Sequence, residues 1–144
     1  MVGEDCLYYD TDSCIYVARP GIAEPPLGDY LGQLTSELDP GQYITEYVAS
    51  GPKSYAYRQE NGKEVCKVRG FQLNFENSQL INFDAIKDMV IQGSRDTITV
   101  TNPSKICRDP QKAVIYNRVE EKNFRMVYTK RHITEDLNTL PYGY

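Results

Sequence analysis

Short runs of alternating apolar and polar residues recur along this chain and predict a protein with many β-strands. Two such runs, residues 2–9 and 14–17, flank the polar cluster Asp10-Thr11-Asp12-Ser13, which is the pattern of a β-hairpin. Further strand-like runs cover residues 43–50, 53–59 and 64–71. The last two are joined by Glu60-Asn61-Gly62-Lys63, and Asn-Gly is a strong signal for a hairpin turn.

Two segments have the spacing of helices. In residues 28–38, apolar side chains recur at Tyr30, Leu31, Leu34 and Leu38, and Asp39-Pro40-Gly41 ends the segment. A second helix is predicted from Phe83 to about Gln92, with Asn82 as its N-cap and Gly93 as its terminator. The last third of the chain has strand-like runs at 97–101, 112–118 and 124–133. These elements together predict an α+β fold class, and a shift in composition near residues 75–82 favours a subdomain boundary there.

The net charge of −4 is unevenly distributed along the sequence. Residues 1–50 carry nine acidic residues and a single base, Arg19, whereas residues 101–144 carry eight bases and five acids. An acidic first part attracts metal ions, and a mildly basic last part suits phosphates. Ordinary scatter of charge along the chain is the alternative interpretation.

The cysteine and histidine residues do not have the spacing of a zinc site. Cys6, Cys14, Cys66 and Cys107 include no C-x-x-C pair, and the single histidine, His132, is far from all of them. Four reduced thiols in an intracellular protein is the favoured interpretation, and a Cys6–Cys14 disulfide is the alternative if the two face each other across the hairpin. No apolar run approaches the ~20 residues of a membrane span, so no membrane association is expected.

The polar cluster of the first hairpin contains the candidate metal ligands. Asp10 and Asp12 are two residues apart, so at a strand end or tight turn both carboxylates can converge on one site. Carboxylate oxygens suit Mg²⁺ or Mn²⁺, and Mg²⁺ in phosphoryl-transfer sites takes one or two carboxylates together with substrate phosphates. Asp-x-Asp alone is common in turns that bind nothing, so the tripeptide by itself is weak evidence.

The residues around the two aspartates are more specific. Tyr8-Tyr9-Asp10-Thr11-Asp12-Ser13 followed by Ile15-Tyr16-Val17 resembles motif C of family B DNA polymerases, which lies at the tip of a palm hairpin. The resemblance implies that Asp12 is the main metal ligand and that Asp10 supports the site less directly. It also implies a second metal-binding aspartate, in motif A, and a nucleotide-binding lysine. Both would precede Met1 in such a polymerase, and neither is found in this sequence.

A basic and aromatic strip is the candidate nucleic-acid contact. Alternation predicts that Lys53, Tyr55 and Tyr57 share one strand face, where lysine offers charge to a phosphate and tyrosine can hydrogen-bond or stack. An exposed strand face with a solvated lysine is the alternative. Lys53-Ser54-Tyr55 resembles the Lys-x-Tyr motif of the same polymerases, which contacts the primer strand. Lys67 and Arg69, before Gly70, resemble the basic strand end at the passage from palm to thumb, and such phosphate contacts should be salt-sensitive.

The last third resembles a narrower group, the organellar and viral branch of protein-primed-type polymerases carried by Maverick/Polinton transposons. The similar segments are Thr99–Asp109 and Leu140-Pro141-Tyr142-Gly143-Tyr144. This implies a palm in residues 1–75 (a β-hairpin, a helix and antiparallel strands), followed by a β-rich thumb in residues 76–144. Its candidate phosphate contacts are Lys105, Arg108, Lys112, Arg118, Lys122, Arg125, Lys130 and Arg131.

The resemblance implies a C-terminal fragment of a DNA-directed DNA polymerase that carries half of a two-metal Mg²⁺ site. Primer–template DNA and deoxynucleoside triphosphates would be the partners of the intact enzyme, and the subfamily implies a terminal-protein primer and a location in the nucleus or a viral factory. The alternatives are a small, non-catalytic DNA-binding protein derived from a transposon polymerase, and a decayed element that is never made as a protein.

We expect no polymerase activity from this chain alone, because the motif A aspartate and the nucleotide-binding lysine are absent from its sequence. The measurement is extension of a labelled primer on a template by the purified chain with Mg²⁺ and all four nucleotides. Template-dependent extension would contradict the expectation.

Overall fold

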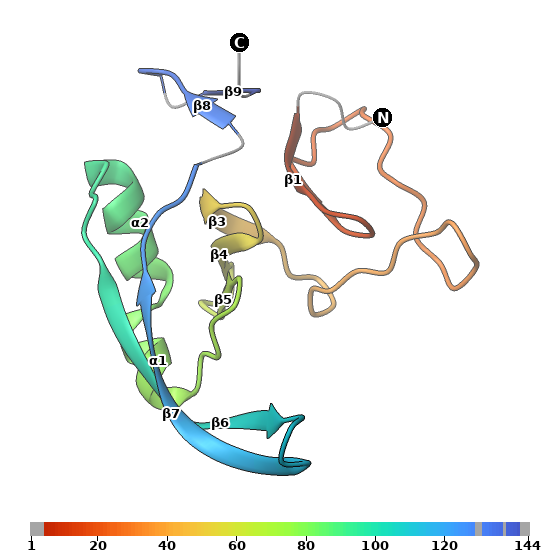
Figure 1. The fold of residues 1–144 in the computed structure, drawn as a ribbon. Helices are drawn as coiled ribbons and strands as arrows, with labels where there is room; N and C mark the ends of the chain where they lie inside the picture. Colours follow the sequence, from red (N-terminus) through yellow and green to blue (C-terminus); the bar gives the residue numbers. More distant parts are fainter. Residues whose placement is uncertain (1–4, 129–130, 137, 142–144) are drawn as a thin grey trace. The chain divides into compact units, whose positions relative to one another are not determined.

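The computed structural model describes residues 5–128, 131–136 and 138–141 of the chain. Figure 1 shows the order of its elements: β1 (Cys6–Tyr9), β2 (Cys14–Tyr16), β3 (Ile44–Gly51), β4 (Ser54–Gln59), β5 (Glu64–Val68), α1 (Phe75–Leu80), α2 (Phe83–Gln92), β6 (Ile98–Asp109), β7 (Val114–Phe124), β8 (Arg131–Ile133) and β9 (Thr139–Pro141). The chain divides into two compact units, Met1–Tyr43 and Ile44–Tyr144, and each is described by itself.

The first unit contains the predicted N-terminal hairpin. Strands β1 and β2 are antiparallel, with Cys6 opposite Tyr16 and Tyr9 opposite Cys14. The turn is closed by the Asp10 N–H, which donates to the Ser13 carbonyl oxygen at 2.9 Å. The hairpin is therefore confirmed. Cys6 and Cys14 do not face each other across it, and both are free thiols.

The helix predicted for residues 28–38 does not form. The segment contains turns and one isolated parallel bridge between Leu27 and Leu34. Gly32 has φ of 91°, outside the helical region, and the side chains of Tyr30 and Leu31 are almost fully exposed. The apolar spacing was misleading because a short helix depends on burying its apolar face, and these side chains are not buried.

The second unit begins with a three-stranded antiparallel sheet in the order β3-β4-β5. The predicted Asn-Gly turn between β4 and β5 is confirmed, with the Gln59 N–H donating to the Lys63 carbonyl at 2.9 Å. Alternation along the strands places Val48, Ala56 and Cys66 on one face and the tyrosines of β3 and β4 on the other. The sheet therefore has an aliphatic face and an aromatic face.

Helix α2 covers the aliphatic face and forms the core with it. The predicted caps are confirmed: the Asn82 side chain accepts a hydrogen bond from the Ala85 N–H at 2.9 Å, and Gly93 has φ of 59°. The helix packs on β3, β4 and β5, and its buried residues are Phe83, Ile86 and Met89. The other buried apolar residues of this core are Val48, Ala56, Val68, Ile81, Val100 and Phe124.

A charge network fastens the start of α2 to the edge of this core. The Arg58 guanidinium lies 4.4 Å from the centre of the Phe83 ring and pairs with Glu46 at 2.9 Å and Asp84 at 2.8 Å. Lys87 and then Arg58 hold the pKa of the Glu46 carboxyl below its usual range. Because this folded-state pKa is depressed, the contribution of Glu46 to stability is present at neutral pH and is lost on acidification through the folded pKa.

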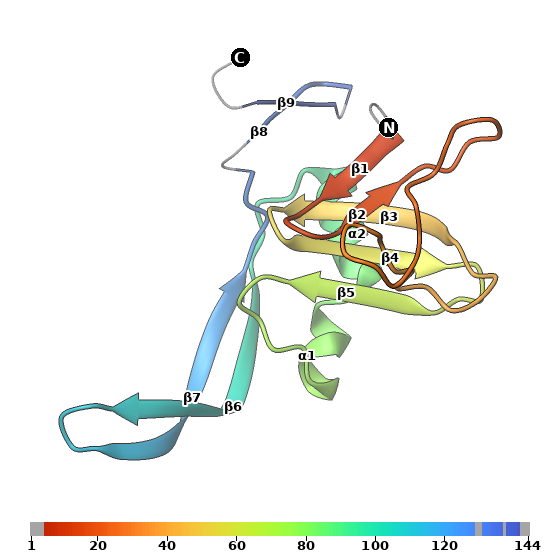
Figure 2. The same cartoon turned by 90° about the vertical axis from the view of Figure 1, so that its right-hand side faces the viewer.

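Strands β6 and β7 form a long two-stranded ribbon that projects away from the sheet and helices of this unit (Figure 2). The strands run well beyond the predicted segments 97–101 and 112–118. Pro103 is accommodated because the register shifts between Asn102 and Lys105. The strand predicted for 124–133 is wrong in its extent, since β7 ends at Phe124 and β8 begins at Arg131.

The predicted α+β fold class is wrong. The described part of the chain is mostly β, with small antiparallel sheets of two or three strands and two short helices. It does not have the architecture of a helix-containing palm followed by a thumb, because each strand pairs with a sequence neighbour and α2 covers only the small sheet. The division at residue 75 stays a prediction.

We expect Phe83→Ala to destabilise the second unit by about 3–5 kcal/mol, the usual cost of emptying a buried aromatic site. Phe83 is 1% exposed, whereas Phe75, which is also the first residue of a helix, is 81% exposed. The matched control Phe75→Ala should change stability by less than about 0.5 kcal/mol. Urea unfolding followed by circular dichroism measures both, and equal losses in the two variants would contradict the assigned core.

Candidate functional site

The tip of the β1–β2 hairpin holds the two candidate carboxylates in different environments. Asp10 is half-buried, and one of its oxygens accepts from the Thr11 N–H at 2.9 Å while the other accepts from the Tyr8 hydroxyl at 3.4 Å. Asp12 is exposed, and within the described residues no hydrogen bond or ion pair holds its carboxylate. Asp10 is thus fixed by its own turn, and Asp12 is the carboxylate available to a ligand.

The hairpin tip offers two carboxylates toward the Mg²⁺ site that the sequence leads us to expect. Mg²⁺ is usually held by one or two carboxylates and completes its shell with water and phosphate oxygens. In the part of the chain that the structure describes, no group of three or more His, Cys, Asp or Glu residues is placed to hold a metal ion. Asp12, with Asp10 beside it, therefore needs further oxygen ligands from a substrate or from another protein segment.

The aromatic face of the β3-β4-β5 sheet carries a row of tyrosine rings, Tyr47, Tyr55 and Tyr57. The Tyr55 ring centre lies 6.1 Å from that of Tyr47 and 6.4 Å from that of Tyr57, with which it is nearly parallel. Tyr55 is 8% exposed, so its ring offers little surface for stacking on a base. Its neighbour across the strands is Lys67, whose ammonium lies 5.9 Å from the ring centre. Tyr55 therefore supports Lys67 through a cation–π contact.

Lys53 lies in the turn between β3 and β4 and not on the strand face that alternation predicted. Strand β4 begins at Ser54, and Lys53 has φ of 57°, which few residues other than glycine adopt. The neighbouring pair of strand residues is Ser54 and Val68, and Arg69 follows Val68 directly. The Arg69 N–H donates to the Ser54 hydroxyl at 3.2 Å.

The structure thus brings three of the predicted cations to one end of the sheet. Lys53, Lys67 and Arg69 are all exposed, and we call these three residues the basic rim. Lys53 and Arg69 flank the paired residues Ser54 and Val68, and Lys67 is opposite Tyr55 in the next pair. We expect three side chains of one sign at a sheet end to favour contacts with phosphate.

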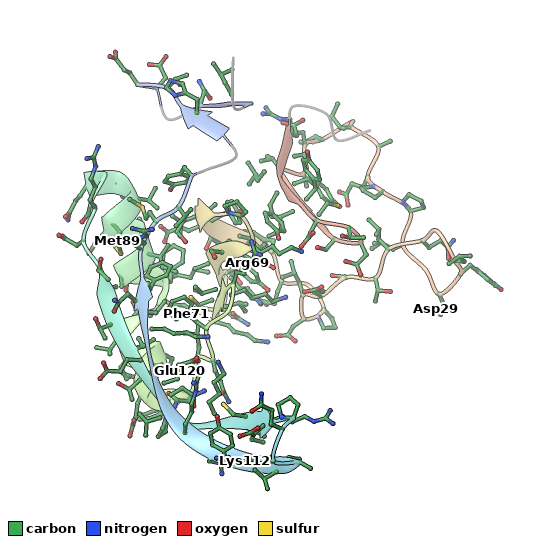
Figure 3. All side chains as sticks on the ribbon, viewed as in Figure 1. Asp29, Arg69, Phe71, Met89, Lys112 and Glu120 are labelled. Carbon is green, nitrogen blue, oxygen red and sulfur yellow. The ribbon has the colours of Figure 1, made fainter. Side chains whose placement is uncertain are left out.

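A second cluster lies at the inner half of the ribbon, around Glu120 (Figure 3). Glu120 pairs with Lys105 across the strands and with Lys122 at 3.1 Å, and Lys105 and then Lys122 hold the pKa of the Glu120 carboxyl below its usual range. These three residues line a cleft of about 340 Å³ together with Phe71 and Asn77. Lys122 also donates to the Gly70 carbonyl at 2.6 Å. Lys105 is therefore partly neutralised and is not a free phosphate contact.

The outer half of the ribbon presents cations to solvent. Arg108, Lys112 and Arg118 are exposed, and Lys112 lies near the ribbon tip in Figure 3. Among the described residues, Arg108 makes no ion pair, whereas Arg118 reaches Glu120 at 3.5 Å. Arg125 is exposed beyond the end of β7. Lys130 and the Arg131 side chain lie outside the described residues.

Sequence reasoning missed the role of Glu120. The sequence shows Glu120 two residues before Lys122, but only the pairing of β6 with β7 reveals that Lys105 also reaches Glu120. The sequence also gave no reason to expect a different reactivity for any one of the four thiols. Burial raises the pKa of Cys66 to about 11, so this thiol is a poor nucleophile at neutral pH.

No protein-family model, curated protein or solved structure matches this chain. In the described part of the chain, none of the helices is long and apolar enough to cross a membrane.

The duplex binding that the sequence leads us to expect should strengthen in Glu120→Gln, because the substitution releases Lys105 and Lys122 from their shared carboxylate. Each additional phosphate that these lysines neutralise should steepen the slope of log Kd against log salt by about 0.9. The matched control is Glu121→Gln, which makes the same charge change at an exposed neighbour. Fluorescence anisotropy with a labelled duplex over a salt series measures both. Equal slopes in the two variants would contradict the role of Glu120.

Proposed function

We propose that this chain takes part in template-directed nucleotidyl transfer as part of a DNA-directed DNA polymerase. The hairpin tip would contribute one half of a two-metal site, and the second unit would bind primer–template DNA. The observation that carries the proposal is the hairpin itself. The residues that resemble the polymerase motif do form a tight antiparallel turn, with the exposed Asp12 at its tip.

The geometry of the tip supports different roles for the two carboxylates. The Asp10 oxygens accept hydrogen bonds from Thr11 and Tyr8 within the turn. The exposed Asp12 carboxylate would be the one that binds a ligand. A divalent ion bound there would help activate a primer 3′-hydroxyl and stabilise negative charge on a triphosphate. The chain's own part would be to present one exposed carboxylate on a hydrogen-bonded turn. The remaining ligands would come from outside the residues identified here.

The basic rim supports the DNA-binding part of the proposal. Lys53, Lys67 and Arg69 are exposed at one end of a packed sheet, and Tyr55 holds Lys67 in place. The outer ribbon adds Arg108 and Lys112 as further cations. Lysine and arginine contacts to phosphates carry no base information, so binding through these residues should be salt-sensitive and indifferent to sequence.

A non-catalytic DNA-binding protein is the second candidate function. The unequal distribution of candidate phosphate contacts and metal ligands between the two units favours it. The candidate phosphate contacts all belong to the second unit, whereas the first unit offers two hairpin carboxylates and no cluster of three ligands among its described residues. The two candidates differ in the role of Asp12. Duplex binding that survives Asp12→Ala, together with no metal binding at the hairpin, would favour the non-catalytic protein.

We expect Mn²⁺, used as a paramagnetic substitute for Mg²⁺, to broaden the amide resonances of residues 10–13 first. Asp12→Asn should weaken this local binding by about tenfold or more, since it removes the charge of the main ligand. Asp29→Asn is the matched control, because Asp29 is an exposed aspartate of the same unit, in the segment without regular structure (Figure 3).

The titration distinguishes a metal site from general acidity of the first unit. Broadening that is centred on other carboxylates, or that responds equally to Asp12→Asn and Asp29→Asn, would contradict the hairpin as a metal site. Loss of the hairpin fold in Asp12→Asn would be seen as shifts of the β1 and β2 resonances without Mn²⁺.

A further inference from the structure

We propose that residues 126–128, which follow β7, are a strap that holds the turn between β3 and β4 in the shape that presents Lys53. The strap consists of Met126, Val127 and Tyr128. It is a positioning element, since the proposed DNA contact is Lys53 of the basic rim and not the strap. The consequence for DNA rests on the proposed function, whereas the effect on the turn does not.

The strap is attached to the end of β3 by two hydrogen bonds, and one of its side chains packs against the hydrophobic core. The Val127 N–H donates to the Ser50 carbonyl at 3.1 Å, and the Tyr128 hydroxyl donates to the Ala49 carbonyl at 2.9 Å. Met126 packs against the hydrophobic core. Burial raises the pKa of the Tyr128 phenol, so the hydroxyl keeps its proton and remains a donor throughout the neutral range.

Gly51 permits the close approach of the strap. A Cβ atom at this position would lie 2.3 Å from the Val127 carbonyl oxygen, which is far inside contact distance and involves a backbone atom. Gly51 also has φ of 148°, a conformation that side-chain-bearing residues rarely adopt. The last residue of β3 is therefore adapted to a strap that lies directly against it.

The contact continues from the strap through the turn to the basic rim. Ser50, which is 2% exposed, donates from its hydroxyl to the Ser54 carbonyl at 3.3 Å. The Ser54 hydroxyl in turn accepts the Arg69 N–H at 3.2 Å. Hydrogen bonds thus connect the strap with both sides of the turn and with the residue that follows β5.

The turn needs such support because Lys53 adopts a left-handed conformation with φ of 57°. A non-glycine residue remains in that region only when its surroundings hold it there. Gly51 and Ser54 are cross-strand partners, which leaves Pro52 and Lys53 as a short connection. The strap fixes the β3 side of that connection. The sequence distance between Lys53 and Tyr128 hides this relation.

The first test is amide hydrogen exchange measured by NMR on the whole chain. In Tyr128→Phe, the amides of Val127 and Arg69 should exchange about fivefold faster, the change expected when one hydrogen bond that limits local opening is lost. Tyr30→Phe is the matched control, because the Tyr30 ring is 82% exposed and lies in the other unit. Gly51→Ala should produce a larger effect, since its Cβ displaces the strap.

Gly62→Ala controls for backbone strain in Gly51→Ala. Gly62 has φ of 82° in the other turn of the same sheet, and a Cβ there would meet nothing within 4 Å. It should therefore leave the exchange of Val127 and Arg69 unchanged. Unaltered exchange at these two amides in both Tyr128→Phe and Gly51→Ala would overturn the proposal.

The second test is a double-mutant cycle in duplex binding. Tyr128→Phe should weaken binding a few-fold in the wild-type background and have no effect in Lys53→Ala, because the strap acts through Lys53. Equal losses in both backgrounds would show that the strap affects stability only, and would overturn its positioning role. If the wild-type chain does not bind duplex, the proposed function fails. The exchange experiment then decides the strap's effect on the turn by itself.

Discussion

The packing of α2 on the aliphatic face of the β3-β4-β5 sheet is the constraint on which the second unit depends. A three-stranded sheet is stable only when one face is covered, and here Phe83, Ile86 and Met89 cover it. Arg58 extends this contact by lying over Phe83 while it pairs with carboxylates from both the sheet and the helix. The opposite face can then carry tyrosines and a lysine without any part in holding the helix.

This division of the sheet explains where the candidate chemistry lies. The candidate charged side chains lie at sheet ends and turns, where they are exposed, whereas strands β3, β4 and β5 contribute to the core. Lys53 and Arg69 lie beyond the last paired residues of β4 and β5, and Lys67 stands at the edge of the aromatic face. Asp12 occupies the equivalent position in the first unit, at the tip of a separate hairpin. In both units an exposed charge lies in the turn that joins a pair of antiparallel strands.

Predictions from sequence succeeded where a feature depends on neighbouring residues and failed where it depends on residues far away in the chain. The Asn61-Gly62 turn, the Asn82 cap and the Gly93 terminator depend on neighbouring residues, and all three were predicted. The 28–38 helix failed because its apolar spacing was present without anything to bury Leu31, which is fully exposed. The extent of β6 was missed: the predicted run ended at residue 101, whereas β6 continues past Pro103 with a register shift between Asn102 and Lys105.

The residues of the candidate sites also fall into those predicted from local sequence and those identified only by long-range contacts. Asp10, Asp12 and Lys53 were predicted as site residues from the pattern of their neighbours in sequence. Glu120 and Tyr128 act on residues 15 and 79 positions away, and nothing local marks them. The burial of Tyr55 also comes from tertiary packing, and it changes the expected role of this residue from a stacking surface to a support for Lys67. Long-range contacts thus change the expected role of a residue that a local pattern predicts.

The most direct test of the account is the sequence of the transcript that precedes the codon for Met1. The hairpin offers two carboxylates, and a two-metal site for nucleotidyl transfer requires a further aspartate as well as a cation for the triphosphate. The account predicts an in-frame coding segment that supplies a second metal-binding aspartate and a nucleotide-binding lysine. An in-frame segment of unrelated sequence, or a stop codon directly upstream, would contradict a catalytic role for this hairpin.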